Sequence, residues 1–474
     1  MQPLQFTGRR GGGLADDAAA LLFLEGHAVA AGHEPLKLRL ADTSLSSPAF
    51  AGERASAHRW VVWAIPTWIF TIAFFHRPAP GVITKELMQD FAAGGTMVGL
   101  LSAAYFYTYA GLMIPAGVLV DAFGVRRVVS IGGAVMGAGA LAMAMAPTEA
   151  MLFAGRLAVG AGAAVTFVGA LKIAATWFAP SEFGTLAALT ATAGALGALF
   201  ATAPLAWLVA LAGWRGAFAV VGIATFAGVV LCWAVVRDRP DGARPSDAPA
   251  EAARARLAVA YRGLLAVAGN RHTWPPFFAF FFLYAATGNL MLWGIPYLRD
   301  SYALGRSDAA IYAAATSIAV LGAGPLAGWL SDRWGQRRRA FIALALGLGI
   351  TWVVFVATLG TLPLAGVAAV LFMLGVFSAC FVLVWPLGRD VNPAPLAGVA
   401  VAVVNFGGFL GAAVTQGPLG ALLDAFWDGG VAQGARVYPL AAYRAAFVVC
   451  TVFAVASFVS GLFLRETPPA AAER

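Results

Sequence analysis

The segment Gly117-Val-Leu-Val-Asp-Ala-Phe-Gly-Val-Arg-Arg127 recurs later in the chain as Gly328-Trp-Leu-Ser-Asp-Arg-Trp-Gly-Gln-Arg-Arg338. The shared glycines, leucine, aspartate and arginines of the second copy each lie 211 residues after their counterparts (328 − 117 and 338 − 127). A second pair, Trp214-Arg-Gly-Ala-Phe218 and Tyr443-Arg-Ala-Ala-Phe447, follows in the same order at an offset of 229 (443 − 214). The chain is therefore built from two similar halves.

The composition of these halves indicates a membrane protein. Of 474 residues, 60% are apolar and only 11% are charged, and the mean hydropathy is +0.79, whereas soluble domains carry about 25% charged residues. Apolar runs such as 218–236 and 447–464 have the length of about 20 residues that crosses the bilayer as a helix. We expect an all-α membrane protein with twelve transmembrane helices in two six-helix bundles.

Basic residues gather in alternate loops, which predicts the orientation of the chain. Arg126 and Arg127, the stretch 237–271 and the stretch 333–339 carry most of them. The positive-inside rule places these loops and both termini in the cytoplasm, so the net charge of +8 is no sign of nucleic-acid binding. The predicted division is a cytoplasmic tail (1–58), a first bundle (59–236), a cytoplasmic linker (237–272), a second bundle (273–465) and a short tail (466–474).

The repeated loop resembles the hallmark cytoplasmic loop of the major facilitator superfamily. Gly155-Arg-Leu157, followed by two further glycines, is similar to the fourth-span motif of the same superfamily. The resemblance extends over residues 60–464 and implies two bundles that rock about a central solute site in a bacterial inner membrane. Ala122 and Val125 depart from it, because the family usually has basic residues at these loop positions.

Charged residues of these loops are candidates for controlling the conformational change. A carboxylate there can pair with arginine or meet a helix N-terminus, and so hold one face of a carrier closed. Alternatively, these charges only anchor tight turns on the cytoplasmic side. The gating candidates in these loops are Asp121, Arg126, Arg127, Asp332, Arg333, Arg337 and Arg338; Arg156, which lies within the fourth span, is a further candidate that could instead be structural.

Ionisable residues within the apolar spans are cationic or histidine, since every carboxylate falls in a tail, a loop or a span end. A buried cation without an acidic partner is costly, so an anionic solute would complete the electrostatics. Arg77 is the strongest candidate because Pro78 and Pro80 would break its helix and free main-chain carbonyls, which membrane helices tolerate beside a cavity. Its position resembles the anion-binding arginine of the organophosphate antiporters. The alternative is that Arg77 extends to the lipid headgroups.

Further polar and aromatic side chains could line the same cavity. Tyr105 and Tyr109 share one helix face, and His76 is the first candidate for a coupled proton because it titrates near neutral pH. Each of these residues could instead serve helix packing, and Lys172 could extend to the interface. The predicted substrate-binding residues are Arg77, His76, Tyr105, Tyr109, Lys172, Tyr284, Asn289, Trp293 and Asn405.

These features predict a secondary active or facilitative transporter that moves a small organic anion or zwitterion by alternating access. Carboxylates, amino acids and short peptides are the expected solutes, since Lys172 with Trp177-Phe-Ala-Pro180 looks like bacterial amino-acid and dipeptide carriers. An organophosphate or phosphate antiporter is the alternative within this class, and a transport-inactive membrane sensor is the alternative outside it. We expect a monomer in the lipid bilayer that is not an enzyme, uses no cofactor or metal and binds no nucleic acid, since no catalytic or metal-ligand grouping is present.

Overall fold

The computed structural model describes residues 57–240 and 261–466, without the side chains of residues 332 and 334. Most of the predicted tails and of the predicted linker therefore lies outside the described residues. The same holds for the side chain of Asp332, one of the predicted gating residues.

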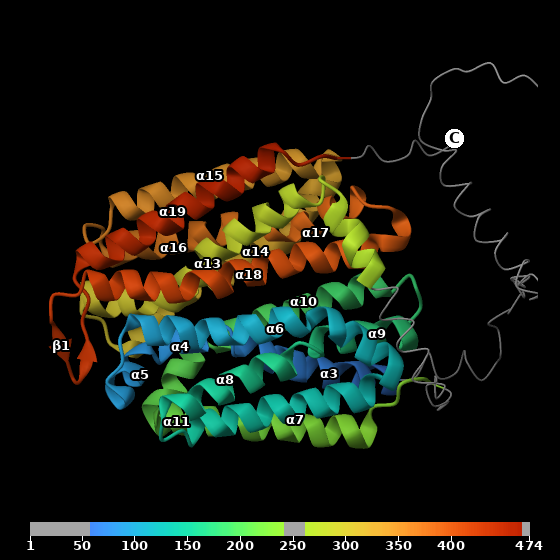
Figure 1. The fold of residues 1–474 in the computed structure, drawn as a ribbon, viewed down its shortest axis with the longest axis horizontal. Coiled ribbons are helices and arrows are strands. Elements are labelled where there is room, and N and C mark those ends of the chain that lie inside the picture. Colours follow the sequence, from blue (N-terminus) through green and yellow to red (C-terminus); the bar gives the residue numbers. More distant parts are fainter. Residues whose placement is uncertain (1–56, 241–260, 467–474) are drawn as a thin grey trace, which may run out of the picture. The chain divides into compact units, whose positions relative to one another are not determined.

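Helices make up nearly all of the described chain (Figure 1). The first half contains α3 (His58–Phe75), α4 (Ala79–Val82), α5 (Thr84–Phe91), α6 (Gly95–Phe123), α7 (Val125–Ala144), α8 (Glu149–Ala163), α9 (Thr166–Trp177), α10 (Phe183–Phe200) and α11 (Ala203–Val235). The second half contains α13 (Trp274–Tyr302), α14 (Arg306–Trp334), α15 (Arg337–Ala357), α16 (Leu364–Ser378), α17 (Phe381–Asp390), η1 (Ala394–Leu396), α18 (Ala397–Ala425), the hairpin of β1 (Val431–Ala432) and β2 (Ala435–Arg436), and α19 (Leu440–Leu462).

Within the described part of the chain, eleven helices are long and apolar enough to cross a membrane. α3, which has 18 residues and begins with His58 and Arg59, lies against α9, α10 and α11 in the first half. Large apolar side chains face outward, among them Trp207 (64% exposed) and Ile223 (63% exposed). A surface of this kind is stable against lipid rather than water, so the prediction of an all-α membrane protein is confirmed. The count of twelve spans and the cytoplasmic termini remain predictions.

The internal duplication is visible in the structure. α6 and α14 have 29 residues each and contain Pro115 and Pro325 at places that differ by one residue. The fourth segment is interrupted in both halves, between α8 and α9 and between α16 and α17. Counting α3–α5, α8–α9 and α16–α17 as single interrupted segments, each half has six helical segments.

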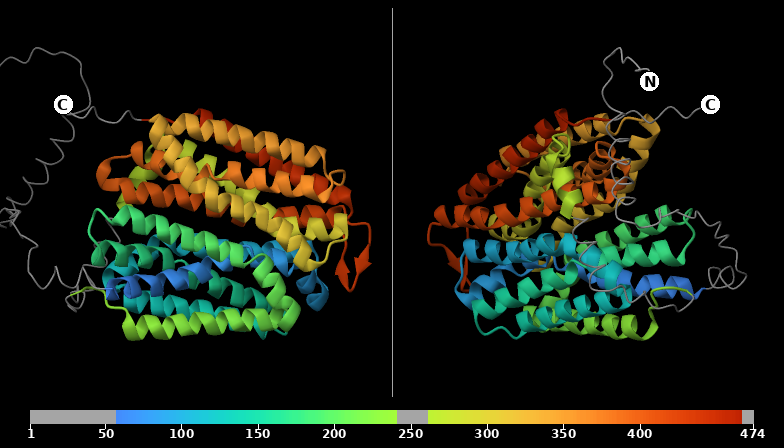
Figure 2. Two further views of the ribbon diagram at one scale, coloured as in Figure 1. Left: turned by 180° about the vertical axis from the view of Figure 1, so that it is seen from behind. Right: turned by 45° about the vertical axis from the view of Figure 1, so that its right-hand side comes forward.

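The two halves lie side by side with their helices running in similar directions (Figures 1 and 2). The most extensive contact between them is that of α6 with α18, and α4 also lies against α13 and α10 against α14. We call the end with the β-hairpin, α5 and the start of α6 the hairpin end. The opposite end, with the α6–α7 and α14–α15 loops, is the basic-loop end.

Candidate solute-binding site

The first helical segment is interrupted at the position where the sequence predicts a break. α3 ends at Phe75, a turn follows at residues 76–78, and α4 begins at Ala79. Proline has no N–H to donate and disfavours the helical conformation in the residue before it, so Pro78 and Pro80 account for the turn. The interruption leaves the Arg77 side chain in the interior, where only 7% of it is exposed. Arg77 thus lies inside the protein rather than among the headgroups.

Aromatic rings surround the Arg77 guanidinium. Its Cζ lies 3.6 Å from the centre of the Phe74 ring, 4.9 Å from Tyr109 and 4.7 Å from Phe409. Its Nε donates to the Tyr105 hydroxyl at 3.5 Å. Among the residues that the structure describes, Nη2 has no hydrogen-bond partner and no carboxylate lies within 4 Å of the guanidinium. Since Phe409 belongs to α18, this cation lies at the contact between the halves, stabilised by ring faces.

Arg156 lies next to the same turn. Its Nη1 donates to the main-chain oxygen of His76 at 2.8 Å, and its Cζ is 5.0 Å from the centre of the Tyr105 ring. Arg156 and His76 are both fully buried. Neither ring nitrogen of His76, nor Nε or Nη2 of Arg156, has a hydrogen-bond partner in the described part of the chain. The sequence grouped Arg156 with the gating loops, whereas the structure brings it to Arg77.

Tyrosines connect these cations to the second half. The rings of Tyr105 and Tyr109 stack at 5.7 Å, as their spacing on one helix face predicts. The Tyr109 ring packs on Phe409 at 4.8 Å, and Tyr284 of α13 packs on Phe409 at 5.6 Å. We call this group the Arg77 cluster; it consists of Phe74, His76, Arg77, Tyr105, Tyr109, Arg156, Tyr284 and Phe409. Sequence reasoning missed the two phenylalanines, because nothing separates them from the many phenylalanines that only pack.

The predicted amide residues occupy the second half. Asn289, on α13, is fully buried and donates to the hydroxyl of Thr415 on α18 at 2.9 Å. Trp293 lies one turn further along α13 and is also fully buried. Asn405 donates to the Met113 sulfur of α6 at 3.2 Å, across the contact between the halves.

The remaining predicted residues lie at the basic-loop end. Lys172 is half exposed and pairs with Asp121 at 2.7 Å, and Asp121 lies twelve residues after Tyr109 on α6, about 18 Å along a helix. Arg126 donates to the main-chain oxygen of Trp233, and Arg127 is exposed. The structure does not bring Lys172 into the Arg77 cluster.

The second-half loop residues also bond within their own half. Arg337 pairs with Asp390 at 2.8 Å, and its main-chain N–H donates to Glu466. Arg338 donates to the main-chain oxygen of Leu462, while Arg333 lies beside the Trp329 ring.

The hairpin end is closed by bonds between the halves. The Asp424 carboxylate of α18 accepts the N–H groups of Gly95 and Thr96, both at 2.8 Å. Lys85 of α5 pairs with Asp300 of α13 at 2.6 Å. Both of these side chains are buried, and burial lowers the pKa of Lys85 although Asp300 opposes that shift.

A group of three charged residues also joins the halves at this end. Glu86 of α5 accepts hydrogen bonds from Arg306 and from Arg299 of the second half, the latter at 3.2 Å. The ion pairs named above at the basic-loop end, in contrast, join residues of one half. Among the ion pairs named here, those that join the two halves lie at the hairpin end.

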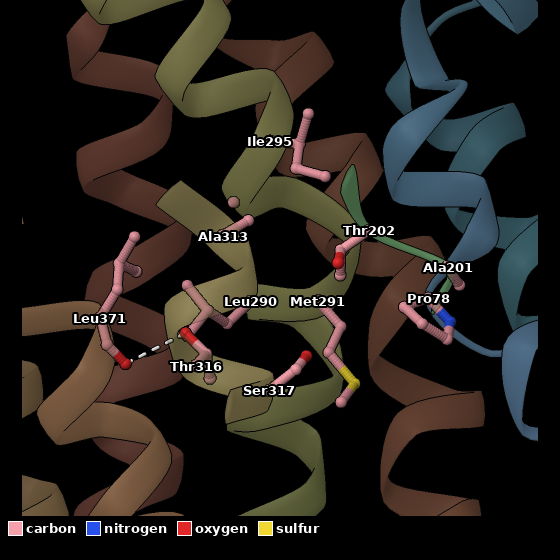
Figure 3. Close-up of a pocket in the computed structure, with 11 residues that line it drawn as sticks. Pro78, Ala201, Thr202, Leu290, Met291, Ile295, Ala313, Thr316, Ser317 and Leu371 are labelled. Atoms are coloured by element: carbon pink, nitrogen blue, oxygen red, sulfur yellow. Dashed lines mark hydrogen bonds between the residues drawn. The ribbon is translucent and has the colours of Figure 1, made fainter. Parts of the chain in front are cut away.

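A small cavity lies between the halves beside the Arg77 turn (Figure 3). Pro78 and Thr202 line it from the first half, and Met291, Thr316 and Ser317 line it from α13 and α14. Its volume of about 30 Å³ holds no more than a few water molecules. An organic solute therefore does not fit in this cavity unless it widens.

The long apolar helices and the duplicated halves define a multi-pass integral membrane protein. Residues 67–416 match the family model of the Major Facilitator Superfamily. The chain belongs to this superfamily, whose members are transporters, so the predicted family and class are confirmed.

Curated relatives are similar over parts of the chain. The uncharacterized transporter YybO of Bacillus subtilis is 27% identical over 38% of this chain and 42% of its own length. The probable sulfoacetate transporter SauU of Cupriavidus necator is 25% identical over 64% of this chain and 71% of its own length. The probable galactarate/D-glucarate transporter GarP of Escherichia coli is 22% identical over 71% of this chain and 81% of its own length. The alignment with YybO thus spans less than half of that relative.

A solved structure shares the fold. The inward-facing, unoccupied structure of a bacterial homolog to the human lysosomal transporter Spinster superposes with a TM-score of 0.71 at 18% identity. The superposition covers 88% of this chain and 100% of that one. It supports the same helical architecture for both proteins.

Proposed function

We propose that this protein is a carrier that moves a small organic anion across the bacterial inner membrane by alternating access. The observation that carries the proposal is the Arg77 guanidinium, which is buried between the halves with a free Nη2 and no carboxylate within 4 Å among the described residues. An arginine fork can hold a carboxylate or sulfonate through two parallel hydrogen bonds. A bound anion would neutralise a charge that is costly to bury alone.

The names of the relatives agree with this chemistry. Sulfoacetate and galactarate or D-glucarate, the solutes in the names of SauU and GarP, are small organic anions. A zwitterion such as an amino acid would need an acceptor for its ammonium group beside two buried arginines. The acidic side chains whose ion pairs are described, such as Asp300 and Asp424, lie near helix ends. An anion without a positive charge is therefore favoured over amino acids and peptides.

The closed hairpin end supports a proposal about the side of the membrane to which the solute site opens in this conformation. If the basic loops face the cytoplasm, as the positive-inside rule predicts, the hairpin end faces outward and is sealed in this conformation. The solute site would then open toward the cytoplasm.

Substitution of Arg77 in proteoliposomes tests the proposal. Uptake and binding of D-glucarate, D-glucuronate and sulfoacetate are compared for wild type, Arg77→Ala, Arg77→Lys and a control, Arg389→Ala, which changes an exposed arginine of α17. We expect Arg77→Ala to weaken anion binding by about 10- to 150-fold, since a hydrogen bond to a charged group contributes about 1.5–3 kcal/mol. Arg77→Lys keeps the charge but loses the forked guanidinium. Its affinity for the anions should therefore lie between those of wild type and Arg77→Ala.

Three outcomes decide among the alternatives. Equal binding of every anion by Arg77→Ala and wild type overturns the assigned site. Selective exchange of sugar phosphates, lost in Arg77→Ala, indicates an organophosphate carrier. Binding without any flux in sealed vesicles indicates a sensor.

A further inference from the structure

Two buried side-chain amides of the second half have free carbonyl oxygens. Asn289 is fully buried and Gln416 is 2% exposed. In the described part of the chain, neither Asn289 Oδ1 nor Gln416 Oε1 has a hydrogen-bond partner. A buried acceptor without a partner carries a desolvation penalty of about 1–3 kcal/mol.

The orientation of both amides is fixed by their other contacts. Asn289 Nδ2 donates to the main-chain oxygen of Ala285 at 2.8 Å, and Gln416 Nε2 donates to that of Gly288 at 3.2 Å. A main-chain carbonyl can only accept, so each amide must direct its NH₂ group to it. Asn289 Nδ2 also donates to Thr415, whose hydroxyl donates in turn to Gly411. The free atom of each amide is therefore its oxygen, an acceptor.

Asn289 and Gln416 belong to the part of the second half that faces the Arg77 turn, since Gln416 bonds to Gly288, the residue before Asn289 on α13. Pro78, which follows Arg77, lines the small cavity together with Leu290 and Met291, which follow Asn289 (Figure 3). α4 approaches α13 so closely that a Cβ added at Gly81 would lie 2.3 Å from the Met291 main-chain oxygen. The interrupted first helix thus places the Arg77 turn against the part of α13 that carries Asn289.

We propose that Asn289 and Gln416 form a subsite for solute hydroxyl groups, so that the preferred solute is a hydroxylated organic acid. This inference rests on the proposed function, in which Arg77 holds the acid group. The solute would then bridge the halves, with its anionic end on α3–α4 and its hydroxyl hydrogens directed to α13 and α18. A ligand ammonium could also donate to these oxygens, but a solute held by Arg77 would bring that ammonium into a buried region with two positive charges, those of Arg77 and Arg156.

Neutral amides suit hydroxyl recognition because they accept a hydrogen bond without adding charge. A solute that lacks hydroxyls would leave both oxygens buried and unpaired, and a site built to bond a hydroxyl group rejects analogues without it. The subsite therefore predicts discrimination between acids of equal charge and length.

The test compares the binding of D-glucarate with that of adipate, a six-carbon dicarboxylate without hydroxyls, to purified wild-type protein. We expect D-glucarate to bind about 100-fold more tightly, at about tenfold for each of two hydrogen bonds. Gln416→Met and Asn289→Ala should each reduce this ratio about tenfold while leaving adipate binding within about twofold of wild type. Gln89→Met, which changes an exposed amide on α5, is the matched control.

Retained adipate binding shows that a variant is folded, and a cooperative thermal unfolding transition checks the fold of any variant that loses both acids. Equal affinity of the wild type for both acids overturns the hydroxyl subsite, and so does a parallel loss of both acids in correctly folded Gln416→Met. Binding of both acids that does not depend on Arg77 contradicts the proposed function instead. Tight binding of galactitol, which has hydroxyls but no charge, also counts against the proposed function rather than the subsite.

Discussion

The carboxylate of Asp424, at the C-terminal end of α18, accepts the main-chain N–H of Gly95, the first residue of α6, at 2.8 Å. The N-cap residue of α6 is Gly94, which has no side chain with which to satisfy the free N–H groups of the first turn. Asp424 supplies that cap from the other half, and its charge is favourable at the positive end of the helix. Thr96, Tyr438 and Arg436 also donate to this carboxylate.

We therefore expect Asp424→Asn to weaken closure of the hairpin end. Loss of the charge weakens several charge-assisted hydrogen bonds, each of which contributes about 1.5–3 kcal/mol. The fraction of molecules that are open at the hairpin end should therefore rise at least about tenfold. Val98, a buried residue of α6, is replaced by cysteine in a protein from which the three native cysteines have been removed. The measurement is the rate at which a maleimide labels this cysteine in detergent.

Asp428→Asn is the matched control for this experiment. Asp428 is exposed and accepts only the N–H of Gly430 among the described bonds, so its variant should label like wild type. Unchanged labelling of Asp424→Asn would show that the cap contributes nothing to closure.

Close approach of two glycines provides a second test of the same contact. A Cβ at Gly420 would lie 2.1 Å from the main-chain oxygen of Gly95, which no ordinary Cβ contact reaches. We expect Gly420→Ala to hold α18 away from α6, to expose the Val98 reporter and to reduce solute flux strongly. Gly111→Ala, on α6 where a Cβ meets nothing within 4 Å, is the control. Normal flux with the reporter still protected in Gly420→Ala would contradict a tightly closed contact here.

The sequence predicted the features that depend on neighbouring residues. Pro78 and Pro80 predicted the interruption at Arg77, and the repeated loops predicted two similar halves, because these signals act within a few residues or recur as a pattern. Contacts that join distant residues were not accessible in this way. Asp424 and Gly95 are 329 residues apart, and nothing near Asp424 in the sequence indicates a helix N-terminus as its partner.

Arg156 shows the same limit inside one half. Its helix carries the fourth-span motif, so the sequence associated it with the gating loops. The crossing of α8 and α6, which brings Arg156 over Tyr105, depends on packing between helices that a single sequence does not specify. The predicted role of the loop charges at the basic-loop end stays a prediction.

Lys172 should contribute little to solute binding. Its pair with Asp121 has side chains 49% and 51% exposed, and exposed ion pairs contribute about 0.2–1 kcal/mol. We expect Lys172→Met to bind D-glucarate within about twofold of wild type and to melt within a few degrees of it. A large loss of affinity without a change in melting temperature would restore Lys172 as a binding residue.

Arg156 should position Arg77 rather than touch the solute. Its hydrogen bond to the His76 main-chain oxygen satisfies a carbonyl that the interrupted helix leaves free, and that carbonyl directly precedes Arg77. Arg156→Gln should therefore lower the melting temperature and weaken D-glucarate binding by about tenfold or more, because a charged hydrogen bond contributes about 1.5–3 kcal/mol. Arg156→Lys, which keeps the charge, should recover part of both losses, and Arg389→Gln should change neither. Isothermal titration and thermal unfolding of the same preparations separate the two effects: a lower melting temperature with full affinity would confine Arg156 to a structural role.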